Sequence, residues 1–118
     1  MEIRSLDAAP PFTTKDGSTI RELVNVGVGP AQNQSLAEAT LEAGQATERH
    51  YHRASEELYY VVEGHGGMEI DGERADVGPG DAILIPPGAW HQLTAGAGRV
   101  RILCCCAPPY SDDDTFFD

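Results

Sequence analysis

Two histidines and a glutamate lie near the middle of the chain at spacings that suit metal binding. His50 and His52 are two residues apart, so in an extended strand their side chains leave the same face, about 6.6 Å apart along the backbone. Glu57 follows five residues later, and the apolar run after it, residues 58–62, predicts the next strand. A turn between the two strands would bring this carboxylate back to the imidazoles, where one cation could bind all three side chains.

A fourth candidate ligand lies in a second short segment, residues 80–91, with the sequence GDAILIPPGAWH. A glycine there precedes the apolar strand Ala82–Ile85, a Pro-Pro-Gly turn redirects the chain, and His91 follows. Three of the four histidines of the chain therefore fall in these two segments. We expect His91 to supply the remaining ligand of the same cation.

The spacings in both segments resemble those of the cupin superfamily, and of its small single-domain bacterial members in particular. The first segment matches the family pattern, with five, one, four and six residues between Gly44, His50, His52, Glu57 and Gly64. The second matches with five, one and two residues between Gly80, Pro86, Gly88 and His91. All nine fixed positions agree. Ala95 replaces an asparagine that the family often has four residues after the last histidine, at a position that is not a ligand.

The resemblance implies that one divalent transition metal ion (Fe, Mn, Ni, Co, Cu or Zn) is bound by His50, His52, Glu57 and His91. On a six-coordinate ion, four protein ligands leave two positions for water, for a chelating substrate, or for a substrate together with dioxygen. Open positions distinguish a catalytic metal site from a structural one. The donor set leaves the identity of the ion open.

Cupins with this ligand set include dioxygenases, decarboxylases, sugar isomerases and polyketide cyclases. We therefore expect a metal-dependent enzyme that acts on a small, oxygen-rich substrate, with a dioxygenase-type oxidoreductase slightly favoured. A redox-neutral isomerase, decarboxylase or other lyase, or a polyketide cyclase, is the first alternative. A cupin that binds a small ligand without turning it over is the second.

Two further residues are candidates for catalysis because each lies two residues from a proposed ligand, on the same face of its strand. Tyr59 lies two residues after Glu57, so its hydroxyl could orient a substrate, or it could be a packed aromatic of the barrel. Glu48 lies two residues before His50 and could act as a general base near the metal, or it could lie at the solvated end of the strand.

The elements that must position these side chains are predicted to be strands. The 118 residues suffice for one domain, and the 13 glycines and 8 prolines separate short apolar runs, which favours strands over helices. We predict strands over residues 18–25, 35–41, 58–62, 68–70, 74–77, 82–85, 90–94 and 99–106, with a hairpin at Asp71-Gly72. Strands of this number and spacing indicate an all-β fold, a single-domain cupin jelly-roll barrel.

The predicted barrel domain covers residues 18–107, between an N-terminal arm, residues 1–17, and an acidic C-terminal tail, residues 108–118. The arm is polar and contains two prolines. In the tail we expect solvated acids, with the alternative that Phe116 and Phe117 cover apolar surface.

Charge and cysteine use limit the partners and the compartment. The formal charge of −11 opposes binding to nucleic acid and to anionic membranes, and no apolar run approaches the roughly 20 residues that span a bilayer. The start of the chain lacks the pattern of a secretory signal, so we expect a cytoplasmic protein. Three consecutive cysteines, Cys104–Cys106, cannot link distant segments, and they predict a core strand, with a thiol near the metal as the alternative. The resemblance also implies a homodimer, for which Leu103 and Cys105 offer apolar atoms.

Overall fold

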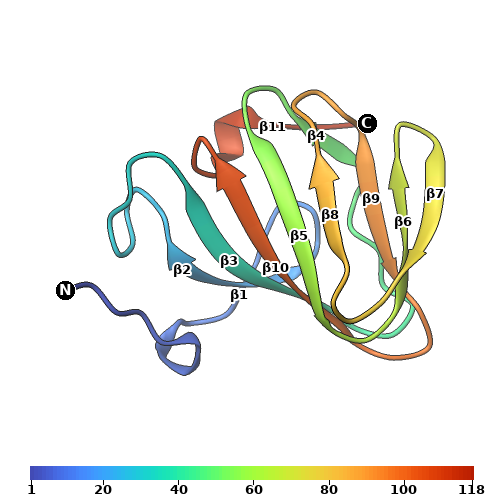
Figure 1. The fold of residues 1–118 in the computed structure, drawn as a ribbon, viewed down its shortest axis with the longest axis horizontal. Helices are drawn as coiled ribbons and strands as arrows, with labels where there is room; N and C mark the ends of the chain where they lie inside the picture. The colour runs from blue at the N-terminus through green and yellow to red at the C-terminus, as the bar shows by residue number, and fades with distance from the viewer.

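The computed structural model describes all residues from 1 to 118 as two antiparallel sheets that face each other (Figure 1). The first sheet has six strands, in the order β1 (Phe12–Thr13), β2 (Thr19–Val24), β3 (Ser35–Leu41), β10 (Val100–Ala107), β5 (Glu56–Glu63) and β8 (Ala82–Ile85). The second has five, in the order β11 (Thr115–Phe117), β4 (His50–His52), β9 (His91–Ala95), β6 (Gly66–Ile70) and β7 (Glu73–Val77). This arrangement confirms the predicted all-β jelly roll.

Only two short helical segments interrupt the strands. They are the 3₁₀ turns η1 (Leu6–Ala8) and η2 (Asp112–Asp114), each three residues long. Neither has the length or apolarity of a helix that crosses a bilayer.

Strict alternation of inward and outward side chains sets the two faces of each sheet. On β5, Glu57, Tyr59 and Val61 are buried, whereas the residues between them are exposed. The buried members of both sheets meet in one core of twelve residues, with Val61, Leu93 and Ile85 at its most enclosed positions. The sequence therefore places apolar side chains and candidate ligands on the same inner face.

Two turns need glycine for different reasons. In the β6–β7 hairpin, Asp71 and Gly72 both have positive φ, 48° and 89°, the geometry of the predicted two-residue turn. Gly64, at the end of β5, has a φ of 82°, and a Cβ there would overlap the carbonyl oxygen of Arg99. This close approach lets the end of β5 lie against the residue just before β10.

Short segments of the predicted arm and of the predicted tail pair with the sheets. Residues Phe12 and Thr13 pair with Ile20 and Thr19 of β2. In the tail, Thr115–Phe117 forms β11 and pairs with the whole of β4. These strands are two and three residues long, too short for an alternation pattern to reveal, and they form because open sheet edges supply hydrogen-bond partners.

An aromatic row lies on the outer face of the second sheet, on the side opposite the histidines. The ring of Tyr51 stacks on Phe116, with centroids 5.1 Å apart, and meets Trp90 edge-on at 4.6 Å. The guanidinium groups of Arg53 and Arg49 cover the two ends of the row, over Phe116 and Trp90 respectively. The row ties β11, β4 and the start of β9 together from outside.

Candidate metal centre

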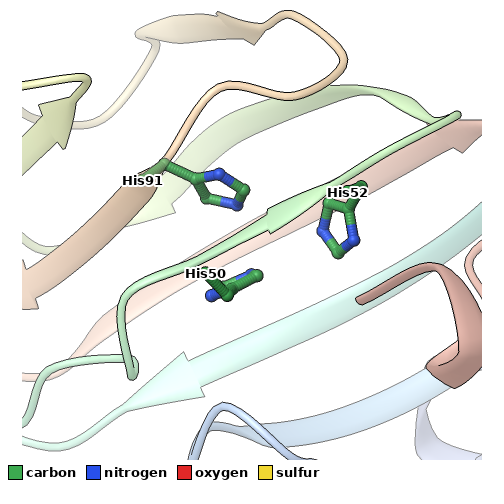
Figure 2. Close-up of side chains that lie close together, drawn as sticks. All are labelled: His50, His52 and His91. Atoms are coloured by element: carbon green, nitrogen blue, oxygen red, sulfur yellow. The ribbon is translucent and has the colours of Figure 1, made fainter. Parts of the chain in front are cut away.

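Two neighbouring strands of the second sheet carry the three histidines. On β4, His50 and His52 are buried and Tyr51 between them points outward, as the two-residue period requires. His91 opens β9 and pairs directly with His50 in the ladder. All three imidazoles point into the space between the sheets (Figure 2). One candidate ligand nitrogen from each ring lies within 4.8 Å of those of the other two.

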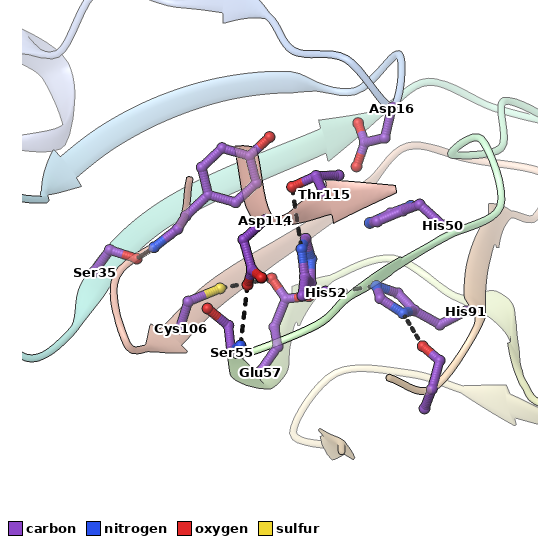
Figure 3. A network of polar contacts seen from close by, with 12 residues as sticks. Asp16, Ser35, His50, His52, Ser55, Glu57, His91, Cys106, Asp114 and Thr115 are labelled. Carbon is purple, nitrogen blue, oxygen red and sulfur yellow. Dashed lines mark hydrogen bonds and ion pairs between the residues drawn. The ribbon is translucent and has the colours of Figure 1, made fainter. Parts of the chain in front are cut away.

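Glu57 reaches the same point from the opposite sheet. Its Oε1 atom lies 3.2 Å from Nε2 of His52 and 3.4 Å from Nε2 of His91 (Figure 3). The carboxylate is 4% exposed and belongs to the inward face of β5. The three histidines therefore form one cluster, and the Glu57 carboxylate lies beside two of them, His52 and His91.

Hydrogen bonds at Nδ1 fix the tautomer of each imidazole. Nδ1 of His50 lies 2.6 Å from the carbonyl oxygen of Glu48, and Nδ1 of His91 lies 3.0 Å from that of Ala89. A carbonyl oxygen can only accept, so both Nδ1 atoms carry the proton. The Nε2 lone pairs of both rings are therefore free to bind a cation.

The third imidazole is fixed by the C-terminal strand. The hydroxyl of Thr115 donates its proton to the carbonyl of Ser111 at 2.9 Å, and its oxygen lies 3.2 Å from Nδ1 of His52. Because the hydroxyl proton of Thr115 is donated to Ser111, the Thr115 oxygen must accept the proton of Nδ1 of His52. All three rings thus present Nε2 to the centre of the site.

Two buried atoms at this centre have no hydrogen-bond partner, Oε1 of Glu57 and Nε2 of His91. Buried polar atoms without partners are rare because leaving them unsatisfied costs free energy. A carboxylate oxygen beside imidazole lone pairs is stable when a cation lies among them. The residues therefore fit a bound divalent transition metal, for which nitrogen and oxygen donors of this kind are suitable ligands.

The charge of Glu57 is maintained by its surroundings. Burial alone would raise the pKa of this carboxyl, but the imidazoles of His52 and His91, when protonated at Nε2 where a cation would otherwise bind, outweigh it and lower the pKa to about 2. The other oxygen, Oε2, accepts a hydrogen bond from the thiol of Cys106 at 3.2 Å. The Cys106 bond leaves Oε1 as the oxygen that faces the imidazoles.

The cysteines lie beside the ligands as protonated thiols. Burial, and then the negative charge of Glu57, raise the pKa of both Cys104 and Cys106. Since only thiolates bind metals well, Cys106 acts here as a hydrogen-bond donor to a ligand. The predicted core strand is observed, and one of its thiols, that of Cys106, contacts the carboxylate of Glu57.

A cavity of about 80 Å³ opens on the ligand cluster. His50, His52 and Glu57 form part of its wall, and thirteen of its 23 lining residues are hydrophobic. The arm supplies Phe12 and Asp16, while the tail supplies Tyr110, whose ring centroid is 5.8 Å from that of His52. Segments at both ends of the sequence thus complete the pocket.

The two predicted catalytic residues have different positions. Tyr59 lines the cavity, is 3% exposed and lies with its ring centroid 6.1 Å from that of His91. Burial raises the pKa of its hydroxyl well above the usual value, so the group is a neutral donor. Glu48 has an exposed side chain that does not line the cavity, and its carbonyl oxygen contacts His50.

Sequence reasoning missed three residues that act near the centre: Asp16, Thr115 and Tyr110. All three lie outside the ligand segments, and no local pattern indicates what they contact. The only signals were that Asp16 precedes the predicted strand over residues 18–25 and that Thr115 precedes Phe116 and Phe117.

The chain belongs to the cupin family, since the model of the cupin domain matches residues 37–106, more than half of the sequence. The relatives include the uncharacterized protein MJ1618 of Methanocaldococcus jannaschii, 46% identical over 92% of this chain and 88% of that protein. An acireductone dioxygenase of Rhodopseudomonas palustris is 33% identical over 80% of this chain. The alignment covers only 53% of that enzyme, so the chain spans about half of its length.

Among solved structures, the polyketide cyclase RemF from Streptomyces resistomycificus has a similar fold. Its TM-score is 0.80 at 26% sequence identity, with 97% of this chain and 89% of that chain covered. Nearly the whole chain therefore has a counterpart in that fold.

Proposed function

We propose that this cupin is a metal-dependent enzyme that acts on a small, oxygen-rich organic substrate. The observation that carries the proposal is the buried cluster of three histidines with the Glu57 carboxylate beside two of them. Two buried atoms of this group have no partner, and a cavity reaches it. In this proposal His50, His52, Glu57 and His91 hold one divalent transition metal ion. When bound, the ion would act as a Lewis acid towards a substrate oxygen.

The protein groups around the ligands would bind and orient the substrate. The neutral hydroxyl of Tyr59 can donate a hydrogen bond to a substrate oxygen. The apolar wall, from residues such as Ile102 and Leu93, excludes water from the rest of the cavity. The cavity of about 80 Å³ beside the candidate ligands can admit the reacting end of a small substrate.

A dioxygenase-type reaction is the favoured form of this proposal. Four protein ligands on a six-coordinate ion would leave two positions, enough for a substrate and dioxygen together. The similarity to an acireductone dioxygenase supports this reading, although the chain matches about half of that enzyme.

Oxygen uptake tests the dioxygenase proposal. Iron-loaded protein would be mixed with a panel of β-diketones and catechol-like compounds, and dissolved oxygen followed with an electrode. We expect uptake with at least one compound, and none with the His52→Ala variant treated in the same way. Uptake no greater than that of the variant with every compound would contradict an oxygen-dependent reaction.

A redox-neutral reaction is the second candidate, and the fold of RemF supports a cyclase in particular. An isomerase, a decarboxylase or another lyase would use the same site. These reactions predict turnover without oxygen in zinc- or manganese-loaded protein. A cupin that binds its ligand without chemistry would instead show ligand binding that survives the loss of His50 and His91.

We also propose that the protein forms a homodimer through the outer face of the first sheet. Leu58, Tyr60 and Leu84 are 46%, 45% and 54% exposed there, and Leu58 pairs with Leu84 across neighbouring strands. Leu103 and Cys105 of β10 lie next to Tyr60 and Leu58 in the ladder. A second copy could cover this continuous apolar face.

We further propose a cytoplasmic location. The three free thiols suit a reducing compartment such as the cytoplasm.

A further inference from the structure

Asp16 is a second carboxylate at the cavity, outside the ligand set. It lies in the turn between β1 and β2 and lines the cavity together with His50, His52 and Glu57. Figure 3 shows its carboxylate on the same side of the site as His50, away from Glu57. The two acids therefore approach the cavity from different directions.

One oxygen of the Asp16 carboxylate accepts two hydrogen bonds, and the other accepts none from the protein. Its Oδ1 atom accepts hydrogen bonds from the backbone nitrogen of Ser18 at 2.9 Å and from the Ser18 hydroxyl at 2.6 Å. Ser18 itself is 1% exposed. Both bonds fall on Oδ1, which leaves Oδ2 available to a molecule in the cavity.

The backbone couples this turn to the metal strand. The carbonyl oxygen of Asp16 accepts a hydrogen bond from the backbone nitrogen of Glu48 at 2.8 Å, two residues before His50. The position of Asp16 relative to the ligands is therefore set by main-chain structure. A flexible surface acid would not have these restraints.

We propose that Asp16 is the general base of this site, an inference that rests on the function proposed above. Oδ2 would take a proton from a C–H or O–H group next to a substrate carbonyl. The electron pair of the broken bond would remain on the substrate, as an enolate or alkoxide whose oxygen faces the ligand cluster. Asp16 becomes neutral as the substrate becomes an anion, so the net charge in the cavity does not change.

This role narrows the class of substrate. Before the proton moves, two carboxylates and one divalent cation would balance to zero charge, and an anionic substrate would add an uncompensated charge. The cavity therefore favours a neutral molecule with an acidic proton, such as an α-hydroxyketone, an enediol or a β-diketone, over a carboxylate.

The test compares Asp16→Asn with the wild type and with Glu48→Gln, a matched change at an exposed acid on the same side. The asparagine oxygen can still accept both bonds from Ser18, so the turn is retained. Zinc affinity is measured by competition with a chelator. Exchange of the C–H protons of hydroxyacetone into D₂O is followed by ¹H NMR without oxygen. Azide binding to cobalt-loaded protein is followed by visible absorption.

We expect all three proteins to bind zinc, with Asp16→Asn binding more weakly than the other two because a negative charge has left the cavity. Asp16→Asn should exchange protons at least about 100-fold more slowly than the wild type, as expected for loss of a general base, whereas Glu48→Gln should not. Asp16→Asn should also bind azide about fivefold more tightly, because a like charge has left the cavity. Unchanged exchange or azide affinity in Asp16→Asn would overturn the proposal, as would wild-type exchange no faster than that of metal-free protein. Failure of the wild type to bind zinc would instead reject the proposed function.

Discussion

The hydroxyl of Thr115 donates to the carbonyl of Ser111 and accepts from Nδ1 of His52, 63 residues earlier in the chain. Through these two hydrogen bonds the last strand places the proton of His52 on Nδ1 and leaves Nε2 available to bind a cation. The two other imidazoles depend on backbone carbonyls for the same purpose. Of the three supports, only that of His52 can be removed by a side-chain substitution.

Thr115→Val should therefore weaken metal binding while leaving the fold intact. Valine has the shape of threonine but cannot accept the proton of Nδ1, and loss of such a support typically lowers metal affinity 10–100-fold. Thr115→Ser, which keeps the hydroxyl, should remain within a few-fold of the wild type. Zinc titration against a chelator measures both. Equal affinity in the valine variant would show that the tautomer of His52 is set by other groups.

Metal should stabilise the folded protein through the four proposed ligands. At a zinc concentration of 100 times the dissociation constant, we expect the free energy of unfolding to rise by about 2.7 kcal/mol. His91→Ala should abolish this gain, measured by denaturant unfolding with and without zinc. His65→Ala is the matched control because His65 is exposed and lies outside the cluster. A gain that disappears in the control, or persists in His91→Ala, would contradict the ligand set.

The cysteines should react slowly with thiol reagents in the native protein. Burial first raises the pKa of Cys104, Cys105 and Cys106, which leaves little of the reactive thiolate at pH 8. With an aromatic disulfide reagent, the native reaction should be more than about tenfold slower than that of the unfolded chain. Cys105 is the least enclosed of the three, so Cys105→Ser should remove the fastest native phase. Rapid reaction of all three thiols before unfolding would rule out this environment.

Acid should weaken the attachment of η2 to the loop after β4. Burial raises the pKa of Asp114, but hydrogen bonds from the backbone nitrogens of Ala54 and Ser55 outweigh it and lower the pKa below its usual 3.8. The resulting stabilisation is fully present above pH 3.8 and is lost as the pH falls through the lower, folded-state pKa.

Asp114→Asn should be less stable than the wild type by about 1 kcal/mol at pH 7, with a smaller difference near pH 2. Asp113→Asn provides the control, since Asp113 is exposed and makes no side-chain bond to this loop. Urea unfolding at several pH values measures the difference. A difference in unfolding free energy between wild type and Asp114→Asn that stays constant with pH would mean that the charge of Asp114 does not contribute to stability.

The proposed dimer should depend on the apolar face of the first sheet. Leu58→Glu places a charge at its centre, so we expect a monomer with an unchanged circular dichroism spectrum. Ala75→Glu, at an exposed position of β7 in the other sheet, should remain dimeric. Light scattering coupled to size-exclusion chromatography measures the mass. A wild-type monomer, or a dimeric Leu58→Glu, would exclude this interface.

Periodicity and turn chemistry were enough to predict the central strands. The strands Ser35–Leu41 and Ala82–Ile85 have the predicted ends, and Asp71-Gly72 forms the predicted hairpin turn. The clustering of the three histidines was also predictable, because His50 and His52 share a parity and the family spacing adds His91; Glu57 lies beside His91.

The remainder of the site depends on contacts between segments far apart in the sequence. A two-residue strand at Phe12 and a three-residue strand at Thr115 carry no detectable period. Asp16 reaches the cavity only because its carbonyl bonds to Glu48, and that pairing is tertiary. The same limit applies to Glu48, for which parity left open a general base near the metal or a residue at the solvated end of the strand; its side chain is exposed.

The aromatic row behind β4 provides a built-in optical probe. Trp90 is the single tryptophan of the chain, it precedes His91, and its ring contacts Tyr51 between the two other histidines. Its emission should respond when an ion pulls the strands together, although the indole lies outside the pocket and cannot touch a substrate. Fluorescence titrations could then follow occupancy in the unlabelled protein, in the same cuvette as the chemistry.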